Sequence, residues 1–208
     1  MNTGKPHCSL LIVLSAPSGG GKTTLCEMLL AKHPNITRAV TCTTRPPREG
    51  ERDGVDYFFL DRPTFETKIA AGEFLEHANV YENLYGNLKS EVLGKLDSGR
   101  HVLLNIDVQG AAAIRDEARS VETLSRSLIS VFLTPATFQK LEERLRKRGS
   151  ESNETLDRRL KEAKVELSCW DQFDYLLIST TKEEDLRRME TIIEAECMRQ
   201  SRANAPEF

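Results

Sequence analysis

Residues 9–25, SLLIVLSAPSGGGKTTL, constrain the possible folds of this chain more than any other stretch. The apolar run at residues 10–14 is short enough to be a buried strand. It ends in a bend at residues 16–21 that contains three consecutive glycines, and the Lys-Thr-Thr at 22–24 then opens a segment with apolar residues at helical spacing. A strand, a glycine-rich loop, a Lys-Thr pair and a helix in this order predict a phosphate-binding P-loop.

The predicted loop binds phosphate mainly through its backbone. Consecutive glycines allow several N–H groups to point inward, and the N-terminus of the following helix adds the positive end of its dipole. Lys22 is expected to reach the β- and γ-phosphates, and the Thr23 hydroxyl to bind Mg²⁺. A flexible glycine-rich turn without a ligand is the alternative. Ala16 stands where the motif usually has its first glycine, and its small side chain is compatible with the same loop geometry.

Composition excludes several functional classes. A chain of 208 residues is long enough for one compact domain with a sizeable core. The net charge of −3 gives no general attraction for nucleic acid or for an anionic membrane. The five cysteines are scattered without a CxxC pair, which favours a reducing compartment, the cytoplasm, over a disulfide framework or a zinc site. No later segment approaches transmembrane length.

Strand and helix patterns alternate along most of the chain. Beyond the first strand, buried strands are expected at residues 101–107, 128–133 and 174–179. The first helix is expected to follow the P-loop and to end at residues 33–34, and a second to start at Val108. Three more are expected: one from Thr134-Pro135 to residue 149, one that begins near residue 152, and one over residues 182–199. This alternation predicts an α/β fold, a P-loop parallel sheet core flanked by helices.

The pattern changes between the first helix and the strand at residues 101–107. This region is expected to contain a short strand at 56–60, a small helix at 63–71, a strand at 74–81, a turn at 83–86 and a helix from 86 to 96. We therefore expect a mostly β insertion over about residues 40–92.

Four side chains outside the loop are candidates for ligand binding. Prolines follow Arg45, so Arg45 and Arg48 are expected in a stiff extended segment that suits bidentate capture of a phosphate; a solvated surface loop is the alternative. Glu76 is an acid among apolar neighbours, and an exposed strand position is its alternative. Asp107 ends a buried strand, where P-loop folds place a Mg²⁺-water ligand, and it can also cap the next helix.

Basic side chains are concentrated on two consecutive helices near residues 141–164. Charge runs of this kind are usually solvated helix faces, and glutamates alternate with them here. Two basic helices joined at a Gly-Ser hinge can also form a mobile lid over phosphates. The basic residues are Arg144, Arg146, Lys147, Arg148, Arg158, Arg159 and Lys161.

Taken together, these segments resemble the guanylate kinase family, and the resemblance covers nearly the whole chain. The most specific part is TTRPPREGERDGVDYFF at residues 43–59, which is similar to the GMP-binding signature of that family. The resemblance implies transfer of a phosphoryl group from Mg²⁺-ATP to GMP. It also implies one domain with a core at about 8–39, 93–140 and 165–208, the GMP-binding insertion at 40–92 and a helical lid at 141–164.

The resemblance assigns roles to individual residues. The implied ATP-binding residues are Ala16, Pro17, Ser18, Gly19, Gly20, Gly21, Lys22, Thr23 and Thr24. The implied GMP-binding residues are Thr41, Arg45, Arg48, Tyr57, Glu76, Tyr85, Gly86, Asn87 and Asp107. The implied catalytic residues are Lys22, Arg45, Arg144, Arg148 and Arg159. The metal would be bound by Thr23 and, through water, by Asp107.

Three positions depart from the commoner family pattern. Asn105 stands where a carboxylate is frequent, Asn87 where a Ser or Thr is usual, and Ser179 where an Asn often contacts adenine. Because of Ser179, loose selection of the donor base is expected. The alternatives are a kinase for another nucleoside monophosphate and a phosphopeptide-binding module of guanylate kinase type. The expected partners are ATP and GMP or dGMP, with no nucleic acid or membrane, in a monomer or weak homo-oligomer.

Overall fold

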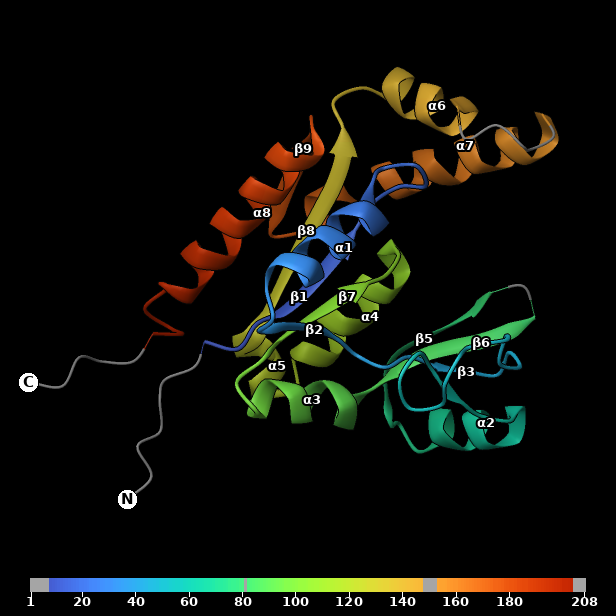
Figure 1. Ribbon diagram of the computed structural model, residues 1–208, viewed down its shortest axis with the longest axis vertical. Coiled ribbons are helices and arrows are strands. Elements are labelled where there is room, and N and C mark those ends of the chain that lie inside the picture. The colour runs from blue at the N-terminus through green and yellow to red at the C-terminus, as the bar shows by residue number, and fades with distance from the viewer. Residues whose placement is uncertain (1–7, 81, 148–152, 204–208) are drawn as a thin grey trace, which may run out of the picture.

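The centre of the molecule is a parallel sheet of five strands in the order β2-β7-β1-β8-β9 (Figure 1). The computed structural model describes residues 8–80, 82–147 and 153–203. The strands are β1 (Leu11–Ser15), β2 (Ile36–Arg38), β7 (His101–Asn105), β8 (Leu128–Pro135) and β9 (Tyr175–Ser179). All four neighbouring pairs run parallel. The predicted α/β fold with a parallel sheet is therefore confirmed.

Helices cover both faces of this sheet because its strands are apolar on both sides. In β1 every residue is buried, and alternate side chains face opposite cores. One core contains Ile12 together with residues of α1 (Lys22–Lys32) and α8 (Lys182–Cys197). The other contains Val13 with residues of the remaining core helices, α3 (Lys89–Asp97), α4 (Val108–Ala118) and α5 (Glu122–Ser127).

A second sheet lies beside the first and has its own small core. Its strand order is β4-β3-β6-β5, and the strands are β3 (Cys42–Thr43), β4 (Phe58–Phe59), β5 (Phe74–Val80) and β6 (Asn83–Leu88). Helix α2 (Arg62–Ala70) packs on it through Phe65, whose ring stacks on Phe74 with centroids 4.3 Å apart. The Asp61 side chain caps this helix by accepting from the Thr64 N–H at 2.7 Å.

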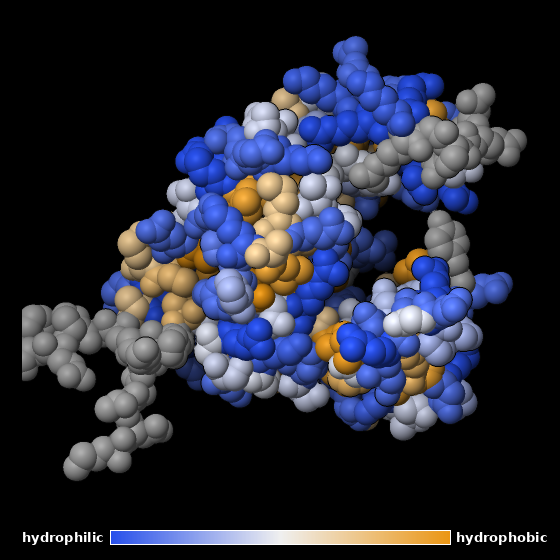
Figure 2. Space-filling model, in the orientation of Figure 1, coloured by the Kyte–Doolittle hydropathy of each residue, from blue (hydrophilic) through white to orange (hydrophobic). Residues whose placement is uncertain are grey.

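Two further helices project beyond the carboxyl end of β8, on the side of the molecule that also holds the second sheet (Figure 1). They are α6 (Phe138–Lys147) and α7 (Asn153–Leu167), and a short 3₁₀ helix at Trp170–Gln172 leads from α7 to β9. Figure 2 shows that this face is hollowed between these helices and the second sheet. Among the described helices, none combines the length and the apolar composition needed to cross a membrane.

Two local predictions are wrong. The expected turn at residues 83–86 belongs to β6, which pairs antiparallel with β5 and continues to Leu88, so α3 begins at Lys89 rather than at Gly86. The Asn and Gly content indicated a turn, but cross-strand pairing decides the conformation here. Thr134-Pro135 does not begin a helix: β8 extends to Pro135, which pairs with Ser179 of β9, and α6 starts at Phe138.

Candidate active site

The predicted phosphate-binding loop connects β1 to α1 at the carboxyl edge of the main sheet. Gly19 and Gly21 have φ of 84° and 104°, a backbone region that favours glycine. A Cβ on Gly20 would lie 2.9 Å from both the Ala16 Cβ and the Pro17 carbonyl oxygen. Position 20 therefore needs glycine, and the absence of a side chain there leaves room for the methyl group of Ala16.

Lys22 lies between this loop and the end of β7. Its Nζ donates to the Ile106 carbonyl oxygen at 2.6 Å. Burial lowers the pKa of Lys22, and the negative charges of Asp107 and Glu166 oppose this shift. The glycine loop encloses a cavity of about 230 Å³, and both Lys22 and Thr23, at the start of α1, line it. A cation and a hydroxyl thus face the space enclosed by the glycine loop.

Glu166 is a residue of this site that the sequence analysis did not identify. It comes from α7, and its Oε2 accepts a hydrogen bond from the Ser18 backbone N–H at 3.0 Å. Burial raises the pKa of the Glu166 carboxyl. No sequence motif predicts this contact, because the two residues are 148 positions apart. An N–H of the loop is therefore already bound to a carboxyl oxygen that the protein itself supplies.

A second polar cluster lies where the second sheet contacts α4. The Thr41 hydroxyl donates to Asn87 Oδ1 at 3.1 Å, and Asn87 Nδ2 donates to Glu76 Oε1 at 2.6 Å. Both Glu76 and Asn87 are buried. Burial raises the pKa of Glu76; the Asn87 hydrogen bond opposes the shift, and the charge of Asp107 adds to it. The structure therefore brings together four residues, Thr41, Glu76, Asn87 and Asp107, that the sequence assigned to one ligand.

Asp107 also caps the amino end of α4. Its Oδ1 accepts from the Gly110 N–H at 2.8 Å, so it is the N-cap of α4. A Cβ on Gly110 would lie 3.3 Å from Glu76 Oε2. The charge of Asp107 raises the pKa of both Lys22 and Glu76, so it lies at the junction of the two polar clusters.

Gly86 shapes this cluster through its lack of a side chain. A Cβ at this position would lie 2.8 Å from a ring carbon of Phe74 and 2.9 Å from the Glu76 carbonyl oxygen. Only glycine therefore allows β5 and β6 to approach this closely. The close approach places Asn87, the next residue, opposite Glu76 in the register of the two strands.

The predicted phosphate-binding arginine Arg45 is held by an acid and by aromatic rings. Arg45 Nη2 donates to both carboxylate oxygens of Glu51, at 2.8 and 2.9 Å, and its guanidinium lies 5.4 Å from the centroid of the Tyr57 ring. Tyr57 in turn contacts Tyr85 edge-on, with centroids 6.3 Å apart. Hydrogen bonds from the Arg45 side chain and the Arg48 backbone lower the pKa of Glu51. The Arg48 N–H donates to Glu51 at 2.7 Å.

Two of the three expected lid arginines, Arg144 and Arg159, lie within the described residues. Arg144 on α6 contacts the loop: its Nη1 donates to the Gly20 carbonyl oxygen and its Nη2 to the Ser179 hydroxyl, both at 3.3 Å. Arg159 is half-buried on α7. Arg148 lies outside the described residues.

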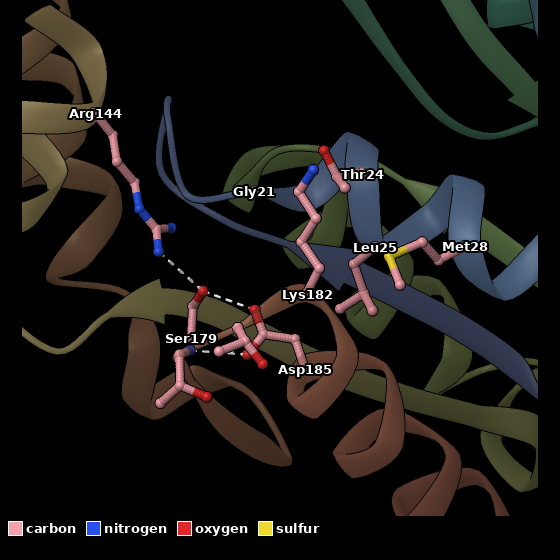
Figure 3. A pocket seen from close by; sticks show the side chains of 10 residues that line it. Gly21, Thr24, Leu25, Met28, Arg144, Ser179, Lys182 and Asp185 are labelled. Carbon is pink, nitrogen blue, oxygen red and sulfur yellow. Dashed lines mark hydrogen bonds between the residues drawn. The ribbon is translucent and has the colours of Figure 1, made fainter. Parts of the chain in front are cut away.

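A separate cavity of about 320 Å³ continues from the loop along α1 (Figure 3). Gly21, Leu25 and Met28 line one side, and Ser179 and Asp185 line the other. Its position next to the phosphate loop, between an apolar helix face and a polar strand end, suits a heteroaromatic base.

Comparison with known proteins identifies the family. A family model described as guanylate kinase matches residues 9–196. The chain belongs to the guanylate kinase family. A guanylate kinase of Clostridium perfringens is 41% identical over 198 residues, which cover 95% of this chain and 88% of that protein. One of Rhodopseudomonas palustris is 42% identical over 193 residues, covering 93% and 85%.

A solved structure agrees with this assignment. The crystal structure of guanylate kinase from Anaplasma phagocytophilum superposes with a TM-score of 0.71 at 34% identity and covers 94% of this chain and 90% of that one. The family resemblance noted in the sequence is therefore confirmed. Membership of the guanylate kinase family does not by itself assign a role to each side chain, so the roles of individual residues remain predictions.

Proposed function

We propose that this member of the guanylate kinase family transfers the γ-phosphoryl group of ATP to GMP, giving ADP and GDP. One observation supports this above all: the phosphate loop and the cluster around Glu76 meet at residues 106–107. Lys22 donates a hydrogen bond to the Ile106 carbonyl, and the charge of the next residue, Asp107, acts on the pKa of both Lys22 and Glu76. A donor phosphate at the loop and an acceptor at the cluster would therefore face each other.

The donor phosphates would be bound by the backbone of the glycine loop and by Lys22. Mg²⁺ is the expected cofactor, because the Thr23 hydroxyl and the Asp107 carboxylate are oxygen donors of the kind that Mg²⁺ prefers. Bound there with ATP, the metal would neutralise charge on the transferring phosphoryl group. Asn105 is exposed at the end of β7 and supplies an amide oxygen where a carboxylate would supply a charge.

The acceptor base would be selected by hydrogen-bond polarity. Guanine presents two donors, N1–H and the 2-amino group, on one edge, and the Glu76 carboxylate can accept both. Adenine presents an acceptor at N1 and no amino group at C2, so the buried carboxylate would stay unpaired, and a penalty of this kind discriminates strongly. Thr41 and Asn87 already hydrogen-bond within this cluster and would complete the base site.

The acceptor phosphate would be bound by Arg45, Arg48, Tyr57 and Tyr85. Arg45 and the two tyrosines lie together, with the Glu51 carboxylate holding the guanidinium in place. A phosphate entering here would share the Arg45 guanidinium with Glu51, which accepts from Nη2 alone. The acceptor then attacks through a phosphate oxygen, so no side chain of the protein has to act as a nucleophile.

We further propose that α6 and α7 act as a lid, with the residue ranges that the sequence suggested: a core at 8–39, 93–140 and 165–208, an insertion at 40–92 and a lid at 141–164. Arg144, Arg148 and Arg159 would approach the transferring group on closure. Closure over the hollow of Figure 2 would exclude water and suppress ATP hydrolysis.

The cytoplasm is the proposed location, and five unpaired cysteines support it. ATP and GMP, with dGMP as a further acceptor, are the proposed substrates. We propose a monomer or a weak homo-oligomer without nucleic-acid or membrane partners, in keeping with the net charge of −3.

The experiment that tests the proposed reaction is steady-state turnover with ATP and Mg²⁺ across a panel of nucleoside monophosphates. GMP should be the preferred acceptor by at least about 100-fold in kcat/KM over AMP, CMP and dTMP. Addition of EDTA should abolish turnover, and Mg²⁺ should restore it. Equal use of GMP and AMP would refute guanine reading by Glu76, and no turnover with any acceptor would refute the enzyme assignment.

A further inference from the structure

The cavity next to the phosphate loop contains a buried serine–aspartate pair (Figure 3). The Ser179 hydroxyl donates to Asp185 Oδ2 at 2.7 Å, and Asp185 Oδ1 accepts from the Thr180 backbone N–H at 2.9 Å. Ser179 and Asp185 are only 9% and 7% exposed. Both carboxylate oxygens therefore have fixed donors within the protein.

This arrangement fixes the polarity of the Ser179 hydroxyl. A carboxylate only accepts hydrogen bonds, and a hydroxyl has one proton to donate. Because that proton is directed at Asp185, only the lone pairs of the Ser179 oxygen remain for other groups. Arg144 Nη2 donates to that oxygen at 3.3 Å, in agreement with an acceptor role. The second lone pair remains for a ligand in the cavity.

The cavity places this acceptor within reach of a donor nucleotide. The loop glycine Gly21 is at one end, and Leu25 and Met28 of α1 form an apolar side. A nucleotide whose phosphates bind at the loop would bring the edge of its base toward β9. Adenine carries a 6-amino group, a donor, at the position where hypoxanthine and guanine carry a 6-oxo group, an acceptor.

We propose that Asp185 is a specificity-determining residue that orients the Ser179 hydroxyl so that the cavity selects a donor nucleotide with a 6-amino purine. This inference rests on the proposed function, because it concerns the donor of that reaction. It replaces the expectation that Ser179 makes donor selection loose. A 6-oxo purine would place its carbonyl oxygen against the remaining lone pair of Ser179, and neither that lone pair nor the carbonyl would have a donor.

The test compares ATP with ITP as donors to GMP, because their bases differ only along the N1–C6 edge. In Asp185→Asn, the Thr180 N–H still requires an oxygen acceptor, so the amide nitrogen faces Ser179 and donates to it. The Ser179 proton then turns into the cavity and favours a 6-oxo group. The ratio of kcat/KM for ATP to that for ITP should fall at least about tenfold relative to the wild-type protein.

Ser179→Ala provides a second variant that does not depend on the folding of the first. It removes the acceptor without supplying a donor, so the ATP-to-ITP ratio should approach one through loss of ATP efficiency. Asp174→Asn is the matched control: Asp174 Oδ2 accepts from the Ser130 N–H and hydroxyl, both at 2.7 Å, at the amino end of β8 and away from the cavity. Its donor ratio should equal that of the wild-type protein.

Calorimetric titration of each protein with ADP and IDP measures the same preference without turnover. A folded Asp185→Asn protein whose ADP-to-IDP and ATP-to-ITP ratios stay within twofold of wild type overturns the inference. If that variant does not fold, an unchanged ratio in Ser179→Ala overturns it. If wild type binds ADP over IDP but does not phosphorylate GMP, the proposed reaction fails while the base selection stands.

Discussion

At the scale of single residues, the site combines charged groups that burial has moved from their ordinary titration ranges. Lys22 and Glu76 illustrate opposite signs: burial lowers the pKa of the ammonium and raises the pKa of the carboxyl. Without a ligand, burial destabilises the charged form of each group relative to its neutral form, and a ligand of opposite polarity would offset this destabilisation. Both side chains are therefore suited to ligand binding rather than to stabilisation of the fold.

The first prediction concerns Lys22. Lys22→Ala removes the side-chain cation at the loop, so kcat should fall by at least about 100-fold. A coupled ADP assay measures this, and circular dichroism checks that the fold is kept. Lys32→Ala is the control, since Lys32 is at the other end of α1 and pairs with Glu190 at the surface; it should retain nearly full turnover. Near-normal activity of Lys22→Ala would contradict the role of the loop.

The second prediction concerns stability and pH at Glu76. Because its folded-state pKa is raised above the ordinary 4.5, the folded protein binds more protons than the unfolded chain, and stability falls as pH rises through 4.5 toward the folded value. Glu76→Gln removes this loss and keeps an oxygen for Asn87. The variant should therefore be more stable than wild type at pH 7.5, with the difference vanishing near pH 4.

Urea unfolding at the two pH values, without nucleotide, measures this difference. Glu122→Gln is the control, because the Glu122 side chain is 86% exposed, and it should match wild type at both. The same Glu76→Gln protein should lose most of its preference for GMP over AMP. A stability gain that persists unchanged at pH 4 would show that relief of ionisation is not its cause.

The sequence predicted the residues of the site that are close together in the chain. Residues 16–24 form a local motif, and the motif at 43–59 contains Arg45, Arg48 and Tyr57. Glu166 and Asp185 were missed. Their contacts, with Ser18 and with Ser179 and Thr180, depend on the packing of α7 on the loop and of α8 on β9. An acid on an amphipathic helix has the same sequence pattern whether it is solvated or buried against a site.

At the scale of elements, glycine has opposite consequences in the loop and in α3. Gly20→Ala would force a Cβ to within 2.9 Å of the Pro17 carbonyl, so the loop must distort, ATP affinity should be lost and the fold should be destabilised by about 1–3 kcal/mol. Gly94 lies in α3, and apart from its chain neighbours and the backbone of its own helix no atom of the described residues lies within 4 Å of an added Cβ. Gly94→Ala should therefore stabilise the protein by about 0.5–1 kcal/mol.

Thermal unfolding and nucleotide titration of the two variants test this third prediction. Gly94→Ala also serves as the control for Gly20→Ala, since both add one methyl group. Gly94→Ala should keep wild-type ATP affinity. Wild-type ATP affinity in Gly20→Ala would show that the loop can bind phosphate without its observed backbone path.

Elements with continuous apolar sequence were predictable, and those defined by pairing were not. β1, β7 and β8 are buried runs that periodicity identifies. β6 contains Asn83, Gly86 and Asn87 and was predicted partly as a turn. Its strand conformation comes from β5 on one side and β3 on the other. Such long-range pairing outweighs the local preference of its residues.

At the scale of the whole molecule, the two proposed substrate sites belong to parts that touch over a limited region. The second sheet contacts the main body through β5 against α4 and through β6 against α3, and α6 and α7 project on the same side of the molecule (Figure 1). Closure of these parts around both substrates is the expected source of the reactive geometry.

The fourth prediction follows from this arrangement. The radius of gyration, measured by small-angle X-ray scattering, should decrease when GMP and a non-hydrolysable ATP analogue are added together, because the hollow of Figure 2 closes. Replacement of GMP by AMP should give a smaller change. A radius that does not change with both ligands would contradict closure.

The contact between Glu166 and Ser18 has a mechanical consequence. Helix α7 is continuous from Asn153 to Leu167, about 20 Å at 1.5 Å per residue, and Glu166 lies in its last turn. A pivot at one end of a rigid rod converts a small rotation there into a displacement many times larger at the far tip. If an incoming triphosphate replaces the Glu166 carboxylate at the loop, binding at the carboxyl end of α7 would displace the amino end of that helix.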